Sequence, residues 1–331
     1  MSGVIIGFEV EWYDSVACDV KKMYLKFWPE DNTLELLKAG NSQSSFLKKI
    51  YYPEVKLQNL FIGSSLSIYN RIMIITNYAN SFTRDYMTSR EIHYLVVLPA
   101  SRFNSLPKIL NLSKQYSLSI ARVRTAGSSV QDFLEFGDIV LELVGISGDN
   151  VDEFISSISR IDREVIAQNV PVEEITSYLE KCSPFQTHSN TTLCLVKPHI
   201  LKEGLTGHLL QSILSEGFTI ESIFSIHMSL PIAETLFDVY RGLYPSYSKM
   251  MEHICSGPVL ALLISNRNGS VVENFRALCG PYEPELAQII APNTLRAKFG
   301  IDNIHNAVHC TDLPDDGEME TRYIFETLAS L

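Results

Sequence analysis

The segment from residue 191 to residue 331 contains a set of polar side chains that could bind an anion and react with it. They are Lys197, Tyr240, Arg276, Arg296, Asn306, His309, Thr311, Asp312 and Glu320. Imidazole is a good nucleophile near neutral pH, because a large fraction of it is uncharged there. Arginine can hold phosphate or carboxylate oxygens in a bidentate manner. These residue types therefore suit a site that holds an anion beside a nucleophile.

Each of these residues also has a simpler interpretation. His309 lies in an apolar, strand-like stretch, where a histidine satisfied within the core is the more common case. Lys197 at a strand end is usually solvated, and Arg276 at helical spacing could extend along the surface. Glu320 could simply favour the dipole near the amino end of a helix. No single residue establishes the site.

The charge balance restricts the partners. The 331 residues carry a formal net charge of -11, which disfavours sequence-independent binding to DNA or RNA. Residues 1–90 hold 10 Lys and Arg against 9 Asp and Glu, and residues 91–190 hold 8 against 13. Residues 191–331 hold 9 against 16. An anion site in this last segment must therefore gather several of its nine cations in one place.

Composition and motifs exclude other classes. With 46% hydrophobic and 20% charged residues, the chain is not expected to be disordered. Its longest clean apolar runs are about six residues, whereas a membrane helix needs about 20, so no membrane partner is expected. The apolar residues 1–8 lack a basic flank, which argues against a signal peptide. The six cysteines have no C-x-x-C spacing, which favours reduced thiols and disfavours zinc. The P-loop and G-x-G-x-x-G nucleotide motifs are both absent.

Patterns along the chain indicate three segments that must position these residues. Residues 1–90 alternate short apolar or β-branched runs with turn sequences, which predicts a small antiparallel barrel or sandwich. Residues 91–185 and 191–331 each show strands alternating with helices, and the second of these looks like a longer repeat of the first. We therefore expect an α+β multidomain protein.

The third segment resembles nucleoside diphosphate kinase. The motifs are Leu193-Cys194-Leu195-Val196-Lys197-Pro198, Ser256-Gly257-Pro258, Thr294-Leu295-Arg296 and Asn306-x-x-His309-x-Thr311-Asp312. The spacings agree as well, because Arg296 precedes Asn306 by ten residues and Glu320 follows Thr311 by nine. The resemblance covers residues 191–329 and implies a ferredoxin-like fold.

The resemblance also implies a mechanism, which is ping-pong transfer through a phosphohistidine. His309 would be the nucleophile, with Thr311 and Glu320 orienting its ring. The residues implied to bind the nucleotide are Lys197, Tyr240, Tyr247, Arg276, Arg296 and Asn306. Mg²⁺ is implied together with ATP or another nucleoside triphosphate. The phosphates rather than side chains would be its main ligands.

The chain departs from the family pattern in two places. Tyr282 stands where a threonine usually contacts phosphate. Two residues are missing between Tyr240 and Ser256, so the counterpart of the base-stacking phenylalanine is ambiguous, and Tyr247 is the nearest candidate.

The second segment looks like a degenerate copy of the third. Leu98 replaces the motif lysine, and no histidine occurs between His93 and His188. We therefore expect no phosphohistidine there.

The first segment resembles the DM-ten domain, whose fold is like a pleckstrin-homology barrel. The motifs are Glu11-Trp12-Tyr13-Asp14, Phe46-Leu47-Lys48-Lys49, Leu60-Phe61-Ile62-Gly63 and Phe82-Thr83-Arg84. One such domain followed by two kinase-like domains is the layout of the nucleoside diphosphate kinase homologue seven family. That layout implies the axoneme of the cilium or flagellum, cytoskeleton or cytoplasm as the location. It implies tubulin, other doublet microtubule inner proteins and the γ-tubulin complex as partners.

Two functions remain open. The first is a structural microtubule inner protein of axonemal doublets that keeps some nucleoside diphosphate kinase activity at His309. The alternative is a soluble or centrosomal nucleoside diphosphate kinase. Tubulin contacts would require local basic patches, for which the candidates are Lys21, Lys22, Lys26, Lys48, Lys49 and Lys56. Solvated strand faces are an equally good interpretation of these lysines.

Overall fold

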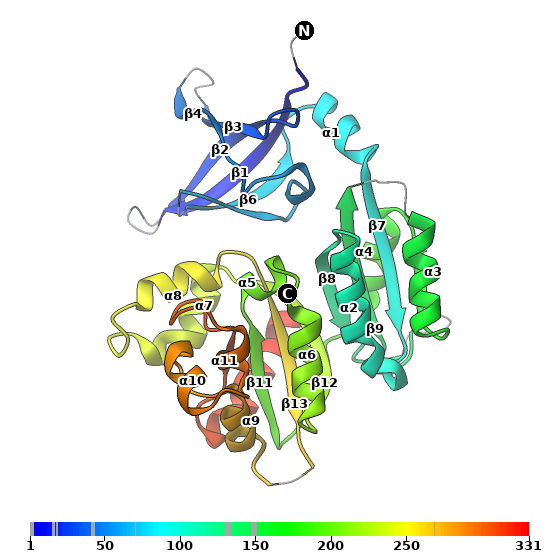
Figure 1. Cartoon of the computed structure of the whole chain (residues 1–331), viewed down its shortest axis with the longest axis vertical. Coiled ribbons are helices and arrows are strands. Elements are labelled where there is room, and N and C mark those ends of the chain that lie inside the picture. The colour runs from blue at the N-terminus through cyan, green and yellow to red at the C-terminus, as the bar shows by residue number, and fades with distance from the viewer. Residues whose placement is uncertain are drawn as a thin grey trace. The chain divides into compact units, whose positions relative to one another are not determined.

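The computed structural model describes residues 3–14, 17, 19–40, 44–69, 71–129, 134–146, 151–267 and 269–330. The chain divides into two compact units, which Figure 1 shows. The first unit contains Met1–Ile92 and Gly145–Ser147, and the second contains His93–Val144 and Gly148–Leu331.

The first unit is a six-stranded antiparallel sheet in the order β4-β3-β2-β1-β6-β5. Its elements are β1 (Ile6–Asp14), β2 (Asp19–Trp28), β3 (Thr33–Lys38), β4 (Ser45–Tyr51), β5 (Ser65–Ile68), β6 (Arg71–Tyr78) and α1 (Ser81–Thr88). Alternate residues of β2, namely Met23, Leu25 and Phe27, are buried, so one face of the sheet forms the core. Met87 brings α1 into the same core.

The basic clusters of this unit are largely neutralised by neighbouring acids. Ion pairs join Lys21 to Asp19, Lys22 to Glu11, Lys26 to Glu35 and Lys49 to Asp31. The pairs lie on or beside the strands themselves. This arrangement favours the interpretation of solvated strand faces over that of a free basic patch.

The second unit contains one eight-stranded sheet in the order β10-β7-β9-β8-β12-β13-β11-β14. The strands are β7 (Glu91–Leu98), β8 (Ser119–Thr125), β9 (Ile139–Ile146), β10 (Ile166–Asn169), β11 (Thr191–Val196), β12 (Thr219–His227), β13 (Pro258–Ser265) and β14 (Val308–Cys310). In each half the first strand lies between the fourth and the third, as in a ferredoxin-like fold. The strand order of the second half is the reverse of that of the first. The two halves join at β8 and β12 and form one continuous sheet.

Hydroxyl groups bridge the junction between β8 and β12. The Thr125 hydroxyl accepts a hydrogen bond from the Ile223 N–H at 2.8 Å. The Ser225 hydroxyl accepts one from the Val123 N–H, also at 2.8 Å. In each bond, the hydroxyl group of one strand accepts from a backbone N–H of the other strand. The two bonds replace part of the backbone hydrogen bonding between β8 and β12.

Helices cover the sheet in both halves. The first half has α2 (Leu106–Gln115), α3 (Val151–Ile161) and α4 (Val172–Lys181). The second half has α5 (Pro198–Lys202), α6 (Thr206–Ser215), α7 (Leu230–Phe237), α8 (Tyr247–Ile254), α9 (Val271–Cys279), α10 (Pro284–Ile290), α11 (Leu295–Phe299) and α12 (Gly317–Arg322). Helix α10 begins at Pro284, a position where the missing N–H of proline costs nothing.

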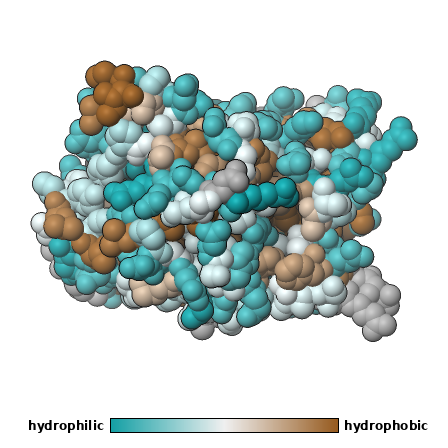
Figure 2. All heavy atoms as spheres, turned by 90° about the horizontal axis from the view of Figure 1, so that it is seen from below, coloured by the Kyte–Doolittle hydropathy of each residue, from teal (hydrophilic) through white to brown (hydrophobic). Residues whose placement is uncertain are grey.

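No helix in the described ranges is both long and apolar enough to cross a bilayer. On the face shown in Figure 2, hydrophobic side chains lie in separate patches between hydrophilic ones.

Helices α2 and α6 cross at Gly207. A Cβ atom at this position would lie 2.4 Å from both the Pro107 carbonyl oxygen and Asn111 Oδ1. Such distances do not occur between real atoms, so the crossing requires glycine.

We therefore expect Gly207→Ala to destabilise the α2–α6 contact by about 1–3 kcal/mol, because the overpacking outweighs the gain of about 1 kcal/mol in helix propensity. Hydrogen exchange of the α2 and α6 amides measures this change. Gln211→Ala, at an exposed position of α6, is the matched control. Unchanged exchange in Gly207→Ala would show that the helices can move apart without cost.

Candidate functional site

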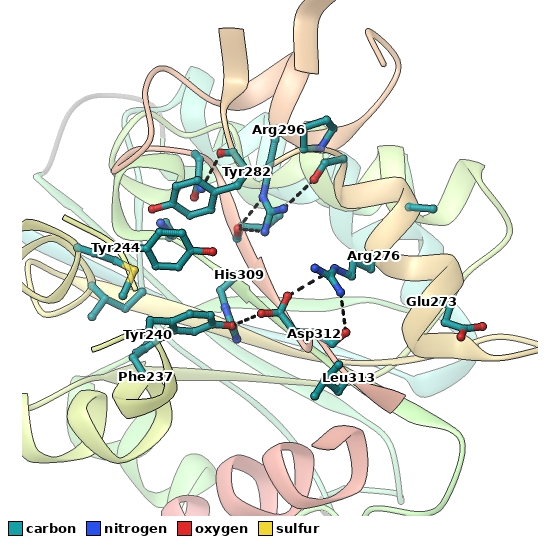
Figure 3. A pocket seen from close by; sticks show the side chains of 18 of the residues that line it. Phe237, Tyr240, Tyr244, Glu273, Arg276, Tyr282, Arg296, His309, Asp312 and Leu313 are labelled. Carbon is teal, nitrogen blue, oxygen red and sulfur yellow. Dashed lines mark hydrogen bonds and ion pairs between the residues drawn. The ribbon is translucent and has the colours of Figure 1, made fainter. Parts of the chain in front are cut away.

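One cavity of the second unit, of about 630 Å³, brings most of the predicted site residues together, as Figure 3 shows. Those that line it are Lys197, Tyr240, Arg276, Arg296, Asn306 and His309. Three of the nine cations of residues 191–331 thus converge on one place. Thr311, Glu320 and Tyr247 are not among the lining residues.

Strand pairing sets the position of the histidine relative to the lysine. In the antiparallel pair of β14 and β11, His309 lies opposite Leu195. The Lys197 N–H then donates to the Ala307 carbonyl at 2.9 Å. Ala307 has a φ of 70°, a left-handed conformation that costs a residue with a side chain roughly 1–2 kcal/mol. The turn before His309 is therefore held in place by the pairing around it.

His309 is buried between two aromatic rings. Its centroid lies 4.9 Å from that of Phe237 and 6.0 Å from that of Tyr240, both edge-on. Burial lowers the pKa of His309 to about 3, so the imidazole is neutral at pH 7. Its Nε2 is buried without a hydrogen-bond partner. Nδ1 is therefore the ring nitrogen left to react with a molecule in the cavity.

The cations are held by backbone carbonyl groups. Arg296 is buried and donates to the carbonyls of Gly280 at 2.7 Å and Val308 at 3.2 Å. The Lys197 ammonium donates to the Ile304 carbonyl at 2.8 Å. Burial, with Arg296 nearby, lowers the pKa of Lys197 to about 7. These groups are fixed in place before any anion binds.

Asp312 connects opposite walls of the cavity. Its carboxylate accepts a hydrogen bond of 2.5 Å from the Tyr240 hydroxyl and pairs with Arg276 at 3.5 Å. Arg276 also donates to the Asp312 carbonyl at 2.8 Å. Burial and the neighbouring carboxylate raise the pKa of Tyr240, which therefore stays protonated. Sequence analysis placed Asp312 in a motif without giving it a role.

Thr311 and Glu320 interact with each other rather than with the histidine. The Thr311 hydroxyl donates to Glu320 Oε2 at 2.7 Å and accepts from the Leu193 N–H at 3.2 Å. Thr311 and Glu320, which were expected to orient the histidine ring, are therefore not among the residues that line the cavity. Burial raises the pKa of Glu320 to about 7.

Tyr244 was missed by sequence analysis, which selected Tyr247. Tyr244 lines the cavity and stacks on Tyr282 at 4.7 Å with an interplanar angle of 10°. Tyr247 instead packs against the core, with the Arg241 guanidinium 5.6 Å from its ring. Tyr244 follows Tyr240 by four residues, and its N–H donates to the Tyr240 carbonyl at 3.3 Å, which keeps the two residues close together. Asn306 fixes the backbone of Tyr282 by donating to its carbonyl at 3.1 Å.

The equivalent position in the other half of the sheet carries no nucleophile. There β10 pairs with β7, and Ala167 lies opposite Val96. If Leu98 is aligned with Lys197, Ala167 occupies the place of His309. At this position the first half of the sheet therefore carries a methyl group where the second half carries an imidazole.

We expect Glu320→Gln to raise stability at pH 8 by about 1–3 kcal/mol relative to pH 5. The pKa of Glu320 is about 7 in the folded state and 4.5 as the ordinary value, so the folded state binds the proton more tightly. Its contribution is therefore greatest below pH 4.5 and is lost as the pH rises through 7. Urea unfolding at both pH values tests this, with Glu318→Gln on the exposed face of α12 as the control. Equal pH dependence in the two variants would contradict it.

The chain is similar to known proteins over the segment that holds this cavity and over nearly its whole length. Residues 190–329 match the family model "Nucleoside diphosphate kinase". Nucleoside diphosphate kinase homolog 7 of Mus musculus is 27% identical over 97% of this chain and 93% of its own length. Nucleoside diphosphate kinase of Aquifex aeolicus is 32% identical over 41% of this chain and 94% of its own length. A crystal structure of the Aquifex aeolicus enzyme, 31% identical, matches 42% of this chain and 97% of its own with a TM-score of 0.39. The chain therefore belongs to the nucleoside diphosphate kinase family and, by the match over nearly its whole length, to the homolog 7 group within it.

Proposed function

We propose that the second unit transfers phosphoryl groups between nucleotides through His309. The observation that carries this proposal is that a neutral, buried histidine shares one cavity with Lys197, Arg276 and Arg296. Phosphoryl transfer depends mainly on positioning and on stabilising negative charge, and carbonyl-held cations supply both.

In the first half-reaction, the lone pair of His309 Nδ1 forms a bond to the terminal phosphorus of a nucleoside triphosphate. The bond from that phosphorus to its bridging oxygen breaks, and the nucleoside diphosphate leaves with the electron pair. Nε2 keeps its proton, so the phosphorylated ring carries the positive charge. In the second half-reaction, a terminal oxygen of another nucleoside diphosphate attacks the phosphorus and the P–N bond breaks.

The cavity suits a nucleotide in size and lining. Its volume of about 630 Å³ falls within the usual range for small-molecule sites. The stacked rings of Tyr244 and Tyr282 offer a face for a nucleobase, while Arg276 and Arg296 suit the phosphates. Tyr282 also lies in the cavity wall where the family has a smaller hydroxyl residue, so we expect slow transfer.

Magnesium would accompany the nucleotide in this proposal. Within the described residues, no group of three or more His, Cys, Asp or Glu could hold a metal ion. The two cavity carboxylates belong to Glu273 and Asp312, and Asp312 is already bound to Tyr240 and Arg276. This donor set fits an ion carried by the phosphates, where it would neutralise part of their charge.

We expect the full chain, incubated with γ-labelled ATP and magnesium, to form an acid-labile, base-stable phosphoenzyme. His309→Ala should abolish the label, because an acid-labile, base-stable label indicates phosphohistidine and His309 is the histidine that lines the cavity with the three cations. His208→Ala, at an exposed position of α6, should retain it. A label that survives in His309→Ala would remove His309 from the mechanism.

We infer, as a second candidate, that the chain is also a structural protein of ciliary or flagellar doublet microtubules, with tubulin and other inner proteins as partners and the γ-tubulin complex as a further one. The observation that favours it is Ala167 at the position equivalent to His309, because this half of the sheet would then serve for packing and contacts alone. The first unit, which we assign to the pleckstrin-homology-like DM-ten class, is likewise unnecessary for phosphoryl transfer.

The position of the tagged full chain in intact axonemes tests this candidate. We expect a regular repeat along the doublets that His309→Ala leaves unchanged, since the contacts would not depend on chemistry. A diffuse cytoplasmic distribution in ciliated cells would contradict the structural role and favour a soluble kinase.

A further inference from the structure

Three histidines form a cluster near Lys197. The histidine cluster consists of His199 on α5, His253 on α8 and His305 in the turn before β14. His199 Nδ1 lies 3.0 Å from His253 Nε2, so one imidazole donates a hydrogen bond to the other. The His305 ring centroid is 4.3 Å from that of His253 and 5.4 Å from that of His199. The cluster therefore ties three separate elements together.

The cluster continues into the turn that holds Lys197. His305 Nδ1 donates to the Asp302 carboxylate at 3.0 Å. Asp302 Oδ1 accepts the N–H groups of both Ile304 and His305 at 2.7 Å. The Ile304 carbonyl, shaped by this turn, accepts the hydrogen bond from the Lys197 ammonium. The next residue in the chain is Asn306, which lines the cavity.

The charges around the cluster require it to be neutral. His199 and His253 are each less than 9% exposed. The charged or titratable groups that act on them are Lys197, Asp302 and the other histidines of the cluster. Burial, with Lys197 nearby, lowers the pKa of both His199 and His253. A proton on either ring would break their shared hydrogen bond or place a cation beside the ammonium.

We propose that the histidine cluster is the positioning element for Lys197, in which neutral imidazoles hold the 301–306 turn against α5 and α8 and thereby keep the lysine ammonium dry and fixed at the cavity wall. The three histidines do not touch the nucleotide in this proposal. Its consequence for phosphate binding rests on the proposed function, but its consequence for Lys197 does not.

The titration of Lys197 in the full chain provides the direct test. Competition labelling with acetic anhydride between pH 5.5 and 9.5, read by mass spectrometry, gives the midpoint for this lysine. We expect a midpoint near 7 in the unaltered protein, since its pKa is lowered to about 7. His305→Ala removes the link to Asp302, and His253→Phe keeps the ring volume but loses the hydrogen bond. Each should let water reach the ammonium and raise the midpoint by at least one pH unit.

Nucleotide affinity provides the second readout. Binding of a fluorescent ADP analogue with magnesium at pH 6.5, where Lys197 is mostly protonated, should weaken at least fivefold in both variants. His208→Ala should change neither readout, because this side chain is exposed on α6.

The outcomes separate the two proposals. An unchanged Lys197 midpoint in both folded variants would overturn the positioning role, whatever the affinity. Shifted midpoints in a protein that binds no nucleotide at any pH would support the positioning role and overturn the proposed function. Far-UV circular dichroism establishes that each variant is folded. If His253→Phe does not fold, the His305→Ala variant, at a half-buried position, decides.

Discussion

The short antiparallel pairing of β14 with β11 is the interaction on which the site depends. It is only three residues long, yet it places His309 beside the strand that ends in Lys197. The turn before β14 includes the left-handed Ala307, and the carbonyls of Ala307 and Ile304 bond to the backbone and side chain of Lys197. A slip of one residue would turn the imidazole to the other face of the sheet. The pairing thus fixes which side chain can react.

Burial then determines the charge of each group around that pairing. Taking His309 and Lys197 out of water favours their uncharged forms, whereas arginine stays ionised in any protein environment. The cavity therefore combines a neutral nucleophile with two permanent cations. Because carbonyl oxygens already orient Arg296, little reorganisation is needed when an anion enters. The arrangement is electrostatically prepared rather than assembled by the ligand.

The sequence was sufficient to predict much of the site, because the spacing of a motif reflects strand and helix geometry. Lys197, Arg296, Asn306 and His309 were assigned from motifs that resemble the family, and Arg276 from the role that the resemblance implies. The structure brings all five to one cavity. The aromatic wall could not be assigned in the same way, since two missing residues removed the register between Tyr240 and Ser256. The hydrogen-bond partner of Glu320 could not be predicted from the sequence either, because both the Thr311 hydroxyl and the His309 ring were candidates. In the structure the Thr311 hydroxyl binds the carboxylate.

The fold was predictable in part for a related reason. Alternation along each strand and the β-α-β order indicated the repeats, which are local properties of the sequence. The shared sheet depends on a nonlocal contact between β8 and β12, joined by the hydroxyls of Thr125 and Ser225. Single hydroxyl residues in strands carry no signal of what they will meet. Helix α10 is hard to recognise from the sequence because it is short and its Ile289 and Ile290 are exposed, which hides the amphipathic pattern.

Because both halves of the shared sheet belong to one chain, their association does not depend on protein concentration. Two copies of such a fold on separate chains would part on dilution, whereas here both sides of the β8–β12 seam belong to one polypeptide. Separation of the two halves is then an opening within a single molecule, whose equilibrium constant does not depend on protein concentration. The half that holds Ala167 therefore stays joined to the edge of β12 at any protein concentration.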